Sequence, residues 1–140
     1  MRRHGPGAWA EPFLGVLPSV IVSSGAMNEK TGLELGDTMI HVIANIRTAP
    51  GRRDELIAAF RELIPIVRAE AGCIEYGTAV DLRTPIAAQA PILEDAVTVV
   101  EKWDGVSALQ AHLVAPHMLA HRERVKAIVT GVEIRILEPL

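Results

Sequence analysis

The sequence is poor in cysteine and has no long run of apolar residues. Cys73 is the only cysteine among 140 residues, so the chain can form no internal disulfide and lacks the cysteine pairs of structural zinc sites. A reducing compartment suits such a chain, and we expect a cytoplasmic protein. Its apolar stretches are too short to cross a bilayer as a helix, so we expect no membrane partner.

The chain also lacks a basic excess and the common nucleotide motifs. Its 14 basic and 17 acidic residues give a net charge of −3, whereas nucleic-acid binding calls for a positive surface. It contains no P-loop, no GxGxxG after a strand and no GxSxG. We therefore expect no nucleic-acid partner and no nucleotide or flavin cofactor.

The first part of the chain differs in pattern from the rest. Residues 1–38 mix glycine, proline and serine with isolated apolar residues and show neither helical nor strand periodicity. A basic start and an apolar stretch at 13–22 have the outline of a signal peptide, but Pro18 interrupts that stretch. We predict that residues 1–38 are a poorly ordered N-terminal extension and that residues 39–140 form the working domain.

Regular patterns begin at Met39. Residues 39–47 are rich in β-branched side chains, as in a strand. Apolar residues then recur at helical spacing, and Pro65 near the end of this helix predicts a kink or a tightened last turn. Pro116 interrupts a second helix, which begins after Gly105. Further strands are predicted at 74–80, 97–103 and 132–137.

The resulting order is βαββαβ, which predicts an α+β protein with a ferredoxin-like fold. Two helices on one face of a four-stranded antiparallel sheet is the economical packing of that order. The other face of the sheet stays uncovered in a monomer, and an apolar patch there favours self-association. We therefore predict a homodimer.

Three histidines cluster on the interrupted second helix: His112, His117 and His121. The last two are four residues apart, a spacing compatible with metal binding, but position 118 is Met and the HExxH motif is absent. We predict no metal site. A neutral histidine beside an apolar cavity suits proton abstraction, while a hydrogen-bonded core histidine is the more common alternative.

Four further polar or aromatic residues lie on the predicted strands. Glu101 and Trp103 share one strand face, where Trp103 either fills the core or forms the flat wall of an aromatic-ligand pocket. Asn45 is polar within an apolar strand, so it must find a partner or face a cavity. Tyr76 is the only tyrosine and suits either the core or a pocket.

Several short motifs extend over the patterned region from residue 39 onward. They are MIHVIA at 39–44, PG at 50–51, EAGCIEY at 70–76, VVEKW at 99–103, LQAHL at 109–113 and PH at 116–117. Together they resemble the antibiotic biosynthesis monooxygenase (ABM) family, in particular its quinol monooxygenase-like branch.

The resemblance implies a homodimer whose two sheets form a dimeric α/β barrel, with a pocket between sheet and helices in each protomer. It also implies oxidation of a hydroquinone or polyphenol to a quinone with O2, without flavin, metal or haem. The chain departs from the family pattern in its N-terminal extension and in a longer loop from Arg83 to Asp95. The resemblance implies catalytic roles for Asn45, Trp103, His112 and His117, and substrate binding by Tyr76 and Glu101.

Two other functions remain open at this point. One is a haem-binding or haem-degrading monooxygenase with a helix histidine as axial ligand, which added haemin would reveal through its absorption spectrum. The other is a non-enzymatic dimeric barrel that binds a small ligand. O2 consumption with a panel of hydroquinones separates this last alternative from an oxidising enzyme.

Overall fold

The computed structural model describes residues 38–140, so the predicted extension at 1–38 lies almost entirely outside the described residues. Within the described part, the chain forms four strands and three helices. They are β1 (Ile40–Thr48), α4 (Arg53–Arg68), β2 (Cys73–Ala79), β3 (Ala96–Trp103), α5 (Val106–Leu113), α6 (Pro116–Val125) and β4 (Val129–Leu137).

The four strands form one antiparallel sheet in the order β2-β3-β1-β4. In the centre, Ile43 on β1 is opposite Val100 on β3 and Arg135 on β4. The ferredoxin-like prediction is therefore confirmed, with the second helix divided into α5 and α6 at Pro116. The dimeric barrel stays a prediction.

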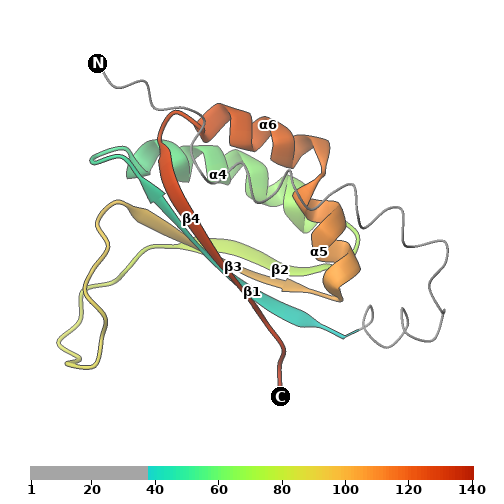
Figure 1. Cartoon of the computed structure of the whole chain (residues 1–140), viewed down its shortest axis with the longest axis horizontal. Coiled ribbons are helices and arrows are strands. Elements are labelled where there is room, and N and C mark those ends of the chain that lie inside the picture. Colours follow the sequence, from blue (N-terminus) through green and yellow to red (C-terminus); the bar gives the residue numbers. More distant parts are fainter. Residues whose placement is uncertain (1–37) are drawn as a thin grey trace.

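Helices α4 and α6 cover one face of the sheet, and α5 lies at one end of that layer (Figure 1). α4 buries Leu56, Phe60, Leu63 and Val67, as its spacing predicted. It continues through Pro65 and ends in bonds of the i,i+3 type, with Ala69 N–H donating to Ile66 O. No helix of residues 38–140 is both long and apolar enough to cross a membrane.

The core lies between this helix layer and the sheet. Because side chains alternate along a strand, Val97, Val99, Glu101 and Trp103 of β3 all point toward the helices and are buried. Each large apolar side chain buried in this way contributes about 1.5–3 kcal/mol relative to an exposed one. The polar Glu101 is the exception in this row, and it lies where the layer opens into a cavity.

The long connection between β2 and β3 leaves the sheet and returns to it (Figure 1). Its two arms are joined by hydrogen bonds: Gln89 Nε2 donates to Leu82 O at 2.6 Å, and Leu93 N–H donates to Asp81 Oδ2 at 2.9 Å. The side chains of Leu82 and Ile86 are exposed on it. None of these loop residues lines the cavity.

Candidate functional site

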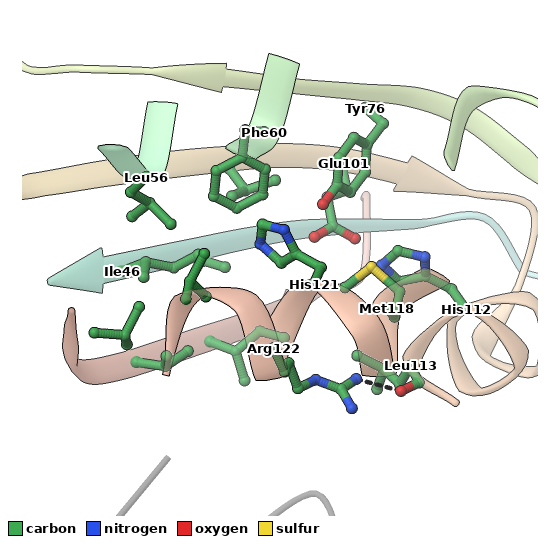
Figure 2. A pocket seen from close by; sticks show the side chains of 16 residues that line it. Ile46, Leu56, Phe60, Tyr76, Glu101, His112, Leu113, Met118, His121 and Arg122 are labelled. Atoms are coloured by element: carbon green, nitrogen blue, oxygen red, sulfur yellow. Dashed lines mark hydrogen bonds between the residues drawn. The ribbon is translucent and has the colours of Figure 1, made fainter. Parts of the chain in front are cut away.

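A cavity of about 80 Å³ lies between the sheet and the helices. Most of its lining is aliphatic or aromatic, and a few polar groups point into it, which is the composition of a small-molecule site. Figure 2 shows Glu101 on the sheet side and two imidazoles on the helix side. The polar or titratable residues of the lining are Tyr76, Glu101, His112, His121 and Arg122.

His112 is the most deeply buried histidine of the described residues, with 1% of its surface exposed. Its Nδ1 donates a hydrogen bond to Oε2 of Glu70 at 2.6 Å. A neutral imidazole carries one proton, so this bond leaves Nε2 as the nitrogen that accepts a proton. Burial lowers the pKa of His112, and the bond to Glu70 opposes that effect. The residue is thus a neutral, oriented base beside an apolar cavity.

Two aromatic rings hold the imidazole of His112 in place. Trp103 lies 4.7 Å from it between ring centroids, and Tyr76 meets it edge-on at 5.5 Å. Trp103 has no exposed surface and does not line the cavity, so it supports the imidazole from behind. Tyr76 does line the cavity, and burial raises the pKa of its hydroxyl.

Glu101 is a buried carboxyl group at the cavity wall, 5% exposed. Burial raises its pKa to about 7, although the Nε1–H of Trp103 donates to Oε2 at 2.7 Å and favours the charged form. Near neutral pH this group exchanges protons readily, because both of its forms are populated. Glu101 therefore supplies the cavity with a hydrogen-bond donor or acceptor according to its protonation.

His121 lines another part of the cavity and packs on Phe60, with ring centroids 4.7 Å apart. Burial, together with Arg124 and Arg122, lowers its pKa to about 4. Arg122 donates to the carbonyl of Leu113 and so joins α6 to the end of α5 (Figure 2). His121 is thus a second neutral imidazole, separate from the one that Glu70 orients.

His117 lies outside the cavity lining, although the sequence placed it beside His112 as a candidate base. Its Nε2 is 3.3 Å from Oε2 of Glu70, an ion-pair distance, but the directions of the groups do not make a hydrogen bond. Glu70 therefore lies between the two histidines. Sequence reasoning did not single out Glu70, although it begins the motif at 70–76.

The turn between α4 and β2 brings Glu70 to this position. Gly72 has a φ of +82°, and a Cβ added there would lie 2.5 Å from Oδ1 of Asp104 and 2.6 Å from Cβ of Ala108. Only glycine fits such a backbone so close to the start of α5. The N–H of Asp104 then donates to the carbonyl of Gly72 at 2.9 Å, which fixes the turn against the helix that carries His112.

Asn45 is not brought to the cavity. It follows Ala44, which lines the cavity, so its side chain points to the opposite face of the sheet. There its Nδ2 donates to Oγ1 of Thr98 at 3.4 Å. Asn45 therefore has a hydrogen-bond partner, as one of the two expectations required, and this partner, Thr98, lies on the outer face of the sheet.

Comparison with known proteins gives a consistent result. The family model described as "Antibiotic biosynthesis monooxygenase" matches residues 39–124. The protein named "Probable quinol monooxygenase YgiN" from Escherichia coli K12 is 39% identical over 103 residues, which covers 72% of this chain and 98% of that protein.

Solved structures share the fold. PA3566 from Pseudomonas aeruginosa is 29% identical, with a TM-score of 0.62 over 74% of this chain and 95% of that one. Rv0793 from Mycobacterium tuberculosis is 28% identical, with a TM-score of 0.60 over 74% of this chain and 96% of that one. The family model extends from β1 into α6 and so includes most of the residues that line the cavity.

Proposed function

The chain belongs to the antibiotic biosynthesis monooxygenase family, and from this premise we propose that it oxidises a hydroquinone or polyphenolic small molecule to a quinone with O2. The family makes it a monooxygenase, and the name of the Escherichia coli relative, a probable quinol monooxygenase, supports a quinol-type substrate. The observation that carries the proposal is the His112 imidazole, oriented by Glu70 at the wall of an apolar cavity.

His112 acts as the general base in this proposal. A phenolic ring gives electrons to O2 far more readily after it loses a proton, so deprotonation is the step that the protein must assist. Nε2 of His112 takes that proton, a contribution typically worth about 10²–10⁴ in rate. Glu70 holds the ring in the tautomer that accepts and stabilises the imidazolium that forms. His117 does not line the cavity, which supports His112 over it as the base.

The other polar groups of the cavity bind and orient the aromatic ring. Glu101 and Tyr76 lie in adjacent strands at paired positions and both line the cavity, so a ring hydroxyl bonds to them while His112 faces the reacting hydroxyl. Trp103 keeps His112 oriented from behind rather than contacting the ring. We assign Asn45 no role in the cavity of its own protomer, because it faces the outer side of the sheet.

The proposed oxidation needs no co-reactant other than O2. The anion transfers an electron to O2, and the radical pair joins at a ring carbon that carries hydrogen, giving a hydroperoxide. Loss of that hydrogen as a proton and cleavage of the O–O bond leave one oxygen on the ring as a carbonyl and release the other as water. A phenol thus becomes a quinone, and a hydroquinone becomes a hydroxylated quinone.

Oxygen-isotope labelling tests the proposal directly. The protein is incubated under ¹⁸O2 with a panel of hydroquinones and phenols. A blank without protein measures the autoxidation of each compound, which is then subtracted. We expect one labelled oxygen in the product and label in the released water, and a kcat at least about tenfold lower for His112→Ala. His41→Ala is the matched control, because His41 lies on the outer sheet face. Unlabelled product with stoichiometric H2O2 would contradict the monooxygenase reaction on that substrate.

A further inference from the structure

Three segments of the chain meet beside the cavity and bring three metal-binding side chains together. Glu70 follows α4, His112 lies near the end of α5 and His117 is in the first turn of α6. One oxygen or nitrogen atom from each lies within 4.8 Å of the other two. Two imidazoles and one carboxylate are a donor set that borderline divalent metals such as Zn²⁺ favour.

One atom of this group is poorly satisfied by the protein alone. Among residues 38–140, Nε2 of His117 is a buried side-chain nitrogen without a hydrogen-bond partner. A buried polar atom left without a partner costs about 1–3 kcal/mol, so such an atom calls for an explanation. It lies 3.3 Å from Oε2 of Glu70, which places it at the edge of the cluster where an ion would bridge them.

We propose that Glu70, His112 and His117 form a binding site for a divalent transition-metal ion, of which Zn²⁺ is the representative. A tetrahedral ion with bonds of about 2.0–2.1 Å keeps its ligand atoms about 3.4 Å apart. The atoms of His117 and Glu70 already have that spacing. The atoms of His112 and Glu70 are 2.6 Å apart and must separate by less than about 1 Å, which follows when the ion replaces the proton between them.

Two of the three side chains are partly exposed, and a water would complete four-fold coordination of an ion bound by the three. The side chains of Glu70 and His117 are 15% and 24% exposed, whereas His112 is 1% exposed. An ion therefore reaches Glu70 and His117 from solvent and is then held by Nδ1 of His112 from the interior. Three protein ligands and one water form the arrangement of an open metal site.

Metal binding at Nδ1 changes the tautomer of His112. Without the ion, Nδ1 carries the proton that Glu70 accepts, and Nε2 is free to act as a base. With the ion on Nδ1, the proton of the neutral ring resides on Nε2. The metal thus converts the base into a donor, and if the proposed oxidation is correct, Zn²⁺ inhibits it.

The test uses the full chain without an affinity tag, stripped of metal, and three probes. Calorimetric titration with Zn²⁺ should give one ion per chain, and Co²⁺ should give the visible absorption of a four-coordinate ion. Nitrogen NMR of the histidine side chains should show the proton of His112 moving from Nδ1 to Nε2 on addition of Zn²⁺. None of these readouts depends on a substrate, so failure of the proposed oxidation leaves them intact.

His117→Ala is the main variant, because His117 is half-buried and its loss spares the bond between His112 and Glu70. We expect at least about tenfold weaker Zn²⁺ binding, since losing even an outer partner of a metal site costs about 10–100-fold. His41→Ala, on the outer sheet face, should bind Zn²⁺ as the wild type does. His121→Asn should also do so, which separates this site from one formed by His117 and His121 at helical spacing.

Three results would overturn the proposal. One is the absence of Zn²⁺ binding at micromolar concentration, in which case the cluster is a hydrogen-bond network only. The second is equal affinity in His117→Ala and wild type. The third is binding with Nδ1 of His112 still protonated, which would exclude it as a ligand.

Discussion

Nδ1 of His112 donates to Oε2 of Glu70 at 2.6 Å, across 42 positions of the sequence. This bond links the turn after α4 to the end of α5 and selects which nitrogen of His112 carries the proton. His112 is buried beside Trp103 and Tyr76, which limits the access of water to its side of the bond, whereas the side chain of Glu70 is 15% exposed. The pair is therefore the part of the site on which both the basicity and the orientation of His112 depend.

Glu70→Gln should lower kcat by at least about tenfold with little change in fold. A glutamine amide that donates to Nδ1 forces the proton onto Nε2, so the ring presents the wrong tautomer to the cavity. Steady-state kinetics on a substrate established by isotope labelling measures the effect. Glu75→Gln is the matched control, because Glu75 is exposed and pairs with Lys102 at 3.0 Å rather than with a histidine of the site.

The pH profile separates a catalytic effect of this variant from a structural one. Glu70 raises the pKa of His112 against the lowering by burial, so its loss lowers that pKa further. A base must be neutral to act, and activity therefore falls as pH drops through this pKa. The acidic limb of kcat/KM should shift to lower pH in Glu70→Gln. An unchanged limb would show that His112 is not the titrating base.

Glu101→Gln should change how stability depends on pH. Burial raises the pKa of Glu101 from 4.5 to about 7, so the folded state holds a proton that the unfolded state has lost over this range. Wild type therefore loses stability relative to the variant as pH rises from about 4.5 to about 7, by about 3 kcal/mol. Urea unfolding at pH 4.5 and pH 8 measures the difference. A constant difference between the two proteins would contradict the raised pKa.

His121 acts in the opposite direction over nearly the same range. Its pKa falls from 6.5 to about 4 on folding, so its contribution to stability is present above about pH 6.5 and is lost toward pH 4. The two groups therefore largely cancel in the wild type between about pH 4.5 and 6.5. In His121→Gln only the effect of Glu101 remains, so the stability of this variant should fall as pH rises. In Glu101→Gln only the effect of His121 remains, so the stability of that variant should increase as pH rises. Parallel curves for both variants would exclude this compensation.

The fold could be predicted from the sequence because its signals are local. The β-branched run on β1, the spacing of Leu56, Phe60, Leu63 and Val67, and Pro116 at the first turn of α6 each act within a few residues. The observed element boundaries differ from the predicted ones by one to three residues. For example, β4 begins at Val129 rather than at 132. At that end of the edge strand, Val129 pairs with Thr48 beyond a register shift, which no local sequence pattern indicates.

The site was harder to predict because it depends on contacts between distant segments. His112 was singled out correctly as a cavity residue, but its partner Glu70 lies in a turn and resembled an ordinary charged residue after a helix. Asn45 was expected in the pocket, and the alternation of β1 places it on the other face. For Trp103 the sequence left the core and the pocket wall as alternatives, and complete burial places it in the core behind His112.

A chain that begins at Met39 should keep the thermal midpoint of the full chain. Residues 38–140 contain a four-stranded sheet, three helices and the buried apolar cluster between them, and β1 begins at Ile40. The sequence before it shows no periodic apolar face with which to join that core. Calorimetry of both chains is the measurement. A loss of several degrees would make the N-terminal segment a structural arm.

The outer face of the sheet leads to the last prediction, that the protein is a homodimer in solution. This face is not covered by the helices, and its centre holds the directly opposed pair Ile43 and Val100, both only partly buried. Apolar side chains at the middle of an uncovered sheet are a typical site of association between identical subunits. Light scattering on a sizing column should give twice the mass of one 15.1 kDa chain.

Val100→Glu tests which face forms this dimer. A carboxylate at the centre of the interface would be desolvated without a partner, whereas in a monomer it faces water, so the variant should fold and run as a monomer. Leu82→Glu is the control, because Leu82 is 74% exposed in the loop between β2 and β3. A monomeric wild type at micromolar concentration would remove the basis for a dimeric barrel. A Val100→Glu variant that stays dimeric would move the interface to another surface.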